Sequence, residues 1–134
     1  MDEPVGPRRL RQAAAICHVV LGLGFGIGAA VSLNHLAREG ELPMTPWGFR
    51  SLAGPFEALG TARFMALGWG LVAVSALDVL GGVWLWRGRR RGARLALLTN
   101  PVAFLLSLGF ALPFLLAGVP IRAALLLAGR RSLR

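Results

Sequence analysis

The sequence contains no lysine and no tyrosine, and it has a single cysteine, Cys17. One cysteine cannot form a disulfide within the chain, and without a CxxC pair the sequence carries neither a dithiol redox motif nor zinc-ligand spacing. Charged residues make up only 16% of the 134 residues, whereas an ordinary soluble domain has about 25%. Hydrophobic residues make up 55%, and the mean hydropathy is +0.62. This composition argues against both a soluble globule and a disordered chain.

Long apolar stretches take up most of the length, which allows a single domain. A helix needs about 20 apolar residues to cross a bilayer, and residues 13–33 and 64–86 meet that requirement. The first stretch exceeds a signal-peptide core of roughly 7–15 residues, so we interpret it as a retained span. Residues 95–129 are too many for one crossing. We expect two spans there, 95–111 and 114–129; one span ending near Gly118, followed by an interfacial helix from Ile121, is the open alternative.

The arginines predict how these spans are oriented. Of the 15 arginines, 11 lie in three segments, at residues 8–11, 87–94 and 130–134. Four spans place all three segments on one side of the membrane, which the positive-inside rule makes cytoplasmic, whereas three spans would place the basic tail outside. The sequence therefore predicts an all-α integral membrane four-helix bundle in the inner (plasma) membrane. Residues 1–134 form a single membrane domain with both termini cytoplasmic and a 27-residue extracytoplasmic loop, residues 34–60.

The basic segment at residues 87–94 has two interpretations. It fixes orientation by the positive-inside rule, which is the interpretation we favour. It also offers a functional alternative, contact with anionic lipid head groups, through Arg87, Arg89, Arg90 and Arg91. Nucleic acid is not an expected partner, because a turn of eight residues between two spans has little room to follow a duplex.

Alternate glycines in the first span predict close helix packing. At about 100° per residue, Gly22 and Gly26 share one face of a helix, while Gly24 and Gly28 share nearly the opposite face. Small residues four apart let helix backbones approach closely in lipid. We favour a centrally packed helix within one bundle. A homo-oligomer or a membrane-protein partner that binds through this span is the alternative.

The extracytoplasmic loop is expected to contain a short helix. Thr45 followed by Pro46 is typical of a helix start, and a helix over residues 46–52 would place Trp47, Phe49 and Leu52 at the membrane surface. We interpret this segment as an interfacial cover for the bundle, with a lid over a cavity as the alternative.

The most informative pattern is one ionisable or strongly polar residue in each predicted span. These residues are His18, Asp78, Asn100 and Arg122. Counted from the cytoplasmic edge at about 1.5 Å per residue, all four lie at a depth of roughly 9–12 Å. Such groups are expensive inside a bilayer and mark candidate sites. We expect an intramembrane polar cluster in which Arg122 neutralises Asp78, either as a static structural ion pair or as a site that exchanges a proton or cation.

No catalytic set accompanies this cluster, because the serines show no pairing with a histidine and no metal-ligand spacing occurs. We therefore expect a membrane protein that is not an enzyme and needs no cofactor or metal, with a scaffold, assembly or accessory role. The alternative is an oligomeric proton- or cation-coupled transporter that uses Asp78. In size and span number the chain is similar to the small multidrug resistance exporters, although their essential carboxylate lies in the first span. An intramembrane lipid-processing enzyme is the third hypothesis.

Overall fold

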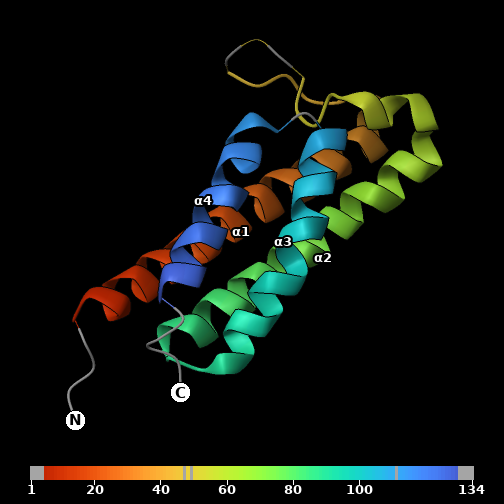
Figure 1. The fold of residues 1–134 in the computed structure, drawn as a ribbon. Helices are drawn as coiled ribbons and strands as arrows, with labels where there is room; N and C mark the ends of the chain where they lie inside the picture. Colours follow the sequence, from red (N-terminus) through yellow and green to blue (C-terminus); the bar gives the residue numbers. More distant parts are fainter. Residues whose placement is uncertain (1–4, 47, 49, 111, 130–134) are drawn as a thin grey trace.

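The computed structural model describes residues 5–46, 48, 50–110 and 112–129, apart from the side chains of residues 5 and 113–115. Long helices pack side by side and lean across one another (Figure 1). In chain order the elements are α1 (Val5–Glu39), the 3₁₀ helix η1 (Pro55–Leu59), α2 (Thr61–Trp86), α3 (Arg90–Gly109) and α4 (Pro113–Gly129). Helices α1, α2 and α3 are long and apolar enough to cross a membrane, and they indicate a membrane protein.

The last apolar stretch folds as two helices. Helix α3 ends at Gly109 and α4 begins at Pro113. The chain reverses direction between these two helices, where the sequence predicted it. Helix α4 continues through Pro120 to Gly129, so the alternative of an interfacial helix beginning at Ile121 is wrong. At 17 residues, α4 lies at the short end of the length range for a transmembrane helix, about 17–25 residues.

The turn between α2 and α3 is shorter than the basic segment that we expected to form it. Only Arg87, Gly88 and Arg89 separate the two helices. Gly88 has a φ of 73°, and the amides of Gly88 and Arg89 donate to the carbonyls of Leu85 and Trp84 at 2.9 Å each. These two bonds are the Schellman pattern, in which a left-handed glycine ends a helix. Because arginine is a good helix former, the rest of the basic segment belongs to the first turns of α3.

One end of the bundle gathers the start of α1, the α2–α3 turn and the end of α4 (Figure 1). We call it the arginine end, because residues 8–11 and 87–91 lie there. Arg11 has a buried side chain and connects these parts. A methyl group placed on Gly88 would lie 3.2 Å from the Arg11 Nη1 atom, and one placed on Gly129 would lie 2.6 Å from the Arg11 backbone nitrogen. The described ends of the first and last helices are therefore in contact.

Small residues set the close approach of the helices. A Cβ atom on Gly22 would lie 2.7 Å from the Ser75 carbonyl oxygen of α2, and one on Gly26 would lie 2.9 Å from the Ser75 Cβ atom. On α3, a Cβ atom on Gly92 would lie 2.6 Å from the Leu85 backbone nitrogen. Gly92 lies within the basic segment, so that segment includes a packing position as well as charges. Helix–helix contact through small residues is the usual arrangement in lipid.

The loop between α1 and α2 differs from the expectation. Helix α1 extends to Glu39, so the first part of the predicted loop is helical. The expected helix over residues 46–52 is wrong at its described positions, since Met44 and Arg50 instead form an isolated antiparallel bridge. Gly48 supplies a φ of 89° within this turn. Trp47 and Phe49, which we expected on that helix, lie outside the described residues.

An aromatic cluster closes the loop end of the bundle. From η1, Phe56 packs edge-on against Phe110 with ring centroids 5.0 Å apart, and Phe64 of α2 does the same at 5.3 Å. Gly109 lies directly under the Phe56 ring. The Ser32 and Ser51 hydroxyls, 2.6 Å apart, join the loop to α1. Edge-to-face aromatic pairs add about 0.5–1.5 kcal/mol each to the area that they bury, so η1 is held on the bundle.

Candidate functional site

A layer of buried polar side chains divides the interior into two apolar clusters. On the loop side lies a cluster that includes Leu33, Leu71, Leu106 and Val119. On the side of the arginine end lies a second cluster, which includes Ala14, Ala15, Leu85, Ala93, Ala96 and Leu126. Between them, each α-helix contributes one of the residues that the sequence singled out: His18, Asp78, Asn100 and Arg122. All four are buried, and His18 and Arg122 have no exposed area.

Helix periodicity explains how these residues reach a common level. On α2, Leu71, Asp78 and Leu85 recur every seven residues and are all buried. On α4, Val119, Arg122 and Leu126 are buried at intervals of three and four. Such spacings repeat one helix face about every two turns. Each polar residue therefore lies at a core position of its helix, where an apolar side chain would normally be buried.

An ion pair between α2 and α4 forms the centre of the layer. The Arg122 Nη1 atom donates to the Asp78 Oδ2 atom at 2.8 Å, and the two side chains are 0% and 4% exposed. A charge-assisted bond of this length is among the stronger hydrogen bonds in proteins. The two charges cancel at a place where either one alone would be costly.

Helix α3 supplies a further hydrogen-bond partner to each member of the pair. The Arg122 Nε atom donates to the Asn100 Oδ1 atom at 2.7 Å. The Thr99 hydroxyl donates to the other carboxylate oxygen of Asp78, also at 2.7 Å. Thr99 is not among the residues that the sequence singled out for this cluster. The one sequence feature that could have indicated its role is its position next to Asn100 in a predicted span. From here on, "polar cluster" denotes His18, Asp78, Thr99, Asn100 and Arg122.

His18 lies beside this network and is oriented by its own helix. Its Nδ1 atom is 2.8 Å from the Ala14 carbonyl oxygen one turn earlier. A carbonyl oxygen only accepts, so Nδ1 carries the proton and Nε2 of the neutral ring keeps its lone pair. The ring lies within electrostatic range of the charges of Arg122 and Asp78.

Three atoms of the polar cluster have no hydrogen-bond partner among the described residues: His18 Nε2, Asn100 Nδ2 and Arg122 Nη2. Nη2 and Nδ2 are donors, and Nε2 of the neutral ring is an acceptor. Buried polar atoms are normally paired. The cluster therefore combines an ion pair with three polar atoms that have unused hydrogen-bonding capacity.

The remaining predicted site residues are distributed as follows. Gly22 and Gly26 face α2, whereas Gly24 and Gly28 are exposed, with no described atom within 4 Å of an added Cβ. The residues considered for head-group contact, Arg87, Arg89, Arg90 and Arg91, are all exposed at the arginine end. Within the described ranges, no group of three or more His, Cys, Asp or Glu side chains is placed to hold a metal ion.

The comparisons with known proteins add no relative. No protein-family model, no curated sequence and no solved structure matches this chain. The function of the protein is therefore inferred from the chain's own residues.

Proposed function

We propose that this protein is a small inner-membrane protein of four spans with both termini cytoplasmic and no catalytic machinery, which acts as a scaffold, assembly or accessory subunit. The crossing of α4 is supported by its contacts, because Gly129 packs against Arg11 at the start of α1. If α1, α2 and α3 cross the bilayer, α4 returns to the side where α1 began. The positive-inside rule assigns that side, the arginine end, to the cytoplasm.

This orientation is tested by labelling single cysteines in intact cells. In a Cys17→Ser background, Met44→Cys should react with a membrane-impermeant maleimide, because exposed Met44 lies in the extracytoplasmic loop. Exposed Arg90, as Arg90→Cys, should react only after the cells are opened. Labelling of Arg90→Cys in intact cells would contradict the proposed orientation.

The ion pair supports the scaffold role most directly. A residue that carries a proton through the membrane must gain and lose it during each cycle. The two oxygens of Asp78 accept from Arg122 and Thr99, and Arg122 stays charged at any accessible pH. These contacts join both carboxylate oxygens of Asp78 to α3 and α4, and they favour a fixed pair that determines which helices meet. We infer that the polar cluster specifies the bundle and leaves its outer faces for a partner.

Site-specific photo-crosslinking in native membranes tests the scaffold role. Ile27 on α1 and Leu105 on α3 are exposed to 62% and 64%, so a photoreactive residue at either position samples a lipid-facing surface. A scaffold should give one discrete crosslinked partner from one of these faces and none from the other. The absence of any discrete product from either face, and from further exposed positions along both helices, would contradict the scaffold role.

A proton- or cation-coupled transporter is the second candidate, and the unpaired atoms of the polar cluster favour it. The Nε2 atom of His18 has no hydrogen-bond partner among the described residues, and its ring is buried like Asp78 and Arg122. Proteoliposomes with an internal pH dye distinguish the two functions. Under the scaffold proposal, the wild type and a folded Asp78→Asn variant leak protons equally slowly. Proton flux that the wild type shows and Asp78→Asn loses would support the transporter.

A further inference from the structure

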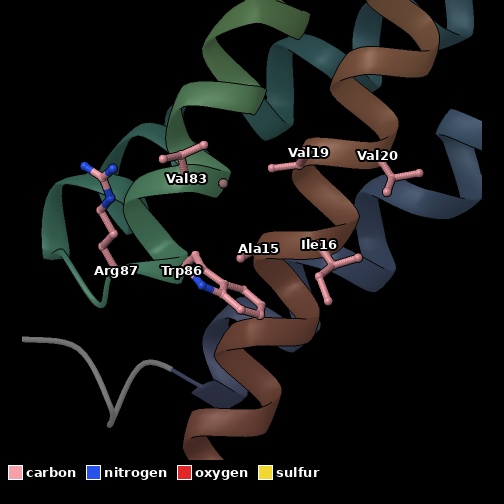
Figure 2. Close-up of a pocket in the computed structure, with 8 residues that line it drawn as sticks. Ala15, Ile16, Val19, Val20, Val83, Trp86 and Arg87 are labelled. Carbon is pink, nitrogen blue, oxygen red and sulfur yellow. The ribbon is translucent and has the colours of Figure 1, made fainter.

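A shallow apolar groove runs between α1 and α2 near the arginine end. Its volume is about 350 Å³, and Figure 2 shows the side chains along it. Aliphatic side chains of both helices form its length: Ala15, Ile16, Val19, Val20 and Val83. The indole of Trp86 extends from α2 toward Ala15 and Ile16 (Figure 2). Arg87 lines the groove beyond Trp86 and is exposed.

A close contact between the two helices at Gly82 forms the floor of the groove. A Cβ atom on Gly82 would lie 2.7 Å from a Val19 methyl group and 2.9 Å from the Ala15 carbonyl oxygen. The helices therefore meet closely at Gly82, and the larger side chains on both sides stand above it as walls. The lining is almost entirely aliphatic and lies along the lipid-facing side of two helices. Its chemistry suits a hydrocarbon chain better than a polar solute.

The charge at the mouth of the groove selects an anion. Arg87 is followed by Arg89, Arg90 and Arg91 on the α2–α3 turn and the first turn of α3, and all are exposed. No described Asp or Glu lies in these segments. Under the proposed orientation this end faces the cytoplasmic leaflet, where anionic phospholipids attract basic residues by about 1 kcal/mol each. A zwitterionic head group would not gain this attraction.

We propose that the groove is a binding site for one anionic phospholipid of the cytoplasmic leaflet. One acyl chain of this lipid lies along the aliphatic walls over Gly82. Trp86 covers the part of the chain below the lipid's ester groups, and the lipid phosphate binds Arg87. This site rests on the proposed orientation of the protein and not on its scaffold role, because it requires only that the arginine end face anionic lipid. A helix of a second copy or of another protein is the competing occupant, and the experiment separates it from lipid.

Trp86 provides the probe, since brominated acyl chains quench tryptophan only at contact range. A variant with Trp47, Trp69 and Trp84 replaced by Phe is placed in phosphatidylcholine vesicles that contain about one phosphatidylglycerol in ten lipids. In one sample bromine is on the phosphatidylglycerol, and in the other it is on an equal amount of phosphatidylcholine. The two samples then have the same surface charge and the same bromine content, and they differ only in which lipid carries the bromine. We expect phosphatidylglycerol to be about five-fold preferred at Trp86, the factor that about 1 kcal/mol supplies.

Two substitutions and two controls complete the test. Arg87→Gln should bring the preference to about one, whereas Arg94→Gln, an exposed arginine outside the groove, should leave it unchanged. Val83→Phe should weaken quenching by both lipids by filling the groove, and Val31→Phe, at an exposed position of α1 outside the groove, should not. Equal quenching by both lipids in the unsubstituted probe would overturn the proposal. Protection of Trp86 from both lipids would also overturn it and would indicate a protein occupant.

A second measurement uses the chain with all four tryptophans. Native mass spectrometry after extraction in mild detergent should show one retained phosphatidylglycerol on the wild type and on Arg94→Gln, and a several-fold lower retained fraction on Arg87→Gln. Equal retention by Arg87→Gln and the wild type would contradict a phosphate contact at Arg87, even if the probe variant with one tryptophan fails to fold.

Discussion

Breaking the ion pair between Asp78 and Arg122 should destabilise the bundle far more than removing both charges together. In Arg122→Met, the Asp78 carboxylate keeps the Thr99 hydroxyl as its one described partner, on a side chain that is 4% exposed. In Asp78→Asn, the guanidinium keeps Asn100 and loses its counter-charge. Removing one partner of a buried pair costs about 3–5 kcal/mol. In the double variant neither position 78 nor position 122 carries a charge, and we expect a net cost of about 1 kcal/mol for the lost hydrogen bonds.

These costs of about 3–5 kcal/mol for each single variant and about 1 kcal/mol for the double variant correspond to a coupling free energy of about 5 kcal/mol or more between the two side chains. Polar contacts between membrane helices couple on average by only about 0.6 kcal/mol, because the unfolded chain in the membrane also finds partners. The experiment is a double-mutant cycle on reversible unfolding in bicelles titrated with sodium dodecyl sulfate. The exposed Arg50–Glu57 pair, at 3.0 Å, serves as the matched control, for which we expect about 0–1 kcal/mol. Additive single effects at positions 78 and 122 would refute the reasoning.

Three further predictions concern packing and the rest of the polar cluster. Thr99→Val should lower the free energy of unfolding in the same titration by about 1–3 kcal/mol, because it removes a donor from a buried carboxylate, while Thr99→Ser should keep most of the stability. Gly92→Leu should lower the thermal midpoint in mild detergent, because its Cβ would lie 2.6 Å from the Leu85 nitrogen. Gly24→Leu, at an exposed position, should change the free energy of unfolding by no more than about 0.5 kcal/mol. Equal losses of stability in the two variants would contradict the packing described for Gly92. Phe56→Ala should expose the loop to protease in right-side-out membranes, since the ring contact with Phe110 at 5.0 Å holds η1 on the bundle, and unchanged cleavage would show that other contacts suffice.

The helices themselves follow from the sequence. Apolar runs of about bilayer length, the prolines and the glycines predicted four helices and the reversal near Leu112. The choice of one polar residue in each span also came from the chain alone, because an ionisable group in an apolar run is conspicuous. Helix boundaries were less accurate, since the basic segment at residues 87–94 has both the charge of a turn and the propensity of a helix.

Other features depended on contacts between segments distant in the chain. The loop's turn at Met44–Arg50 and the docking of Phe56 over Gly109 depend on partners that local propensity does not specify. Thr99 joins the polar cluster because α3 turns its face toward Asp78, and a threonine alone gives no such signal.

Sequence by itself determined that this chain enters lipid, where it divides into helices, and which polar residues must be accommodated there, since hydropathy and charge act locally. Only the tertiary structure decided which of those residues pair, because pairing depends on how α2, α3 and α4 are rotated and offset. The same packing placed Gly82 at the floor of an aliphatic groove with an arginine at its mouth. Its walls come from residues 15–20 of α1 and residues 83–86 of α2. These residues are far apart in the chain, and no local sequence pattern predicts that they meet.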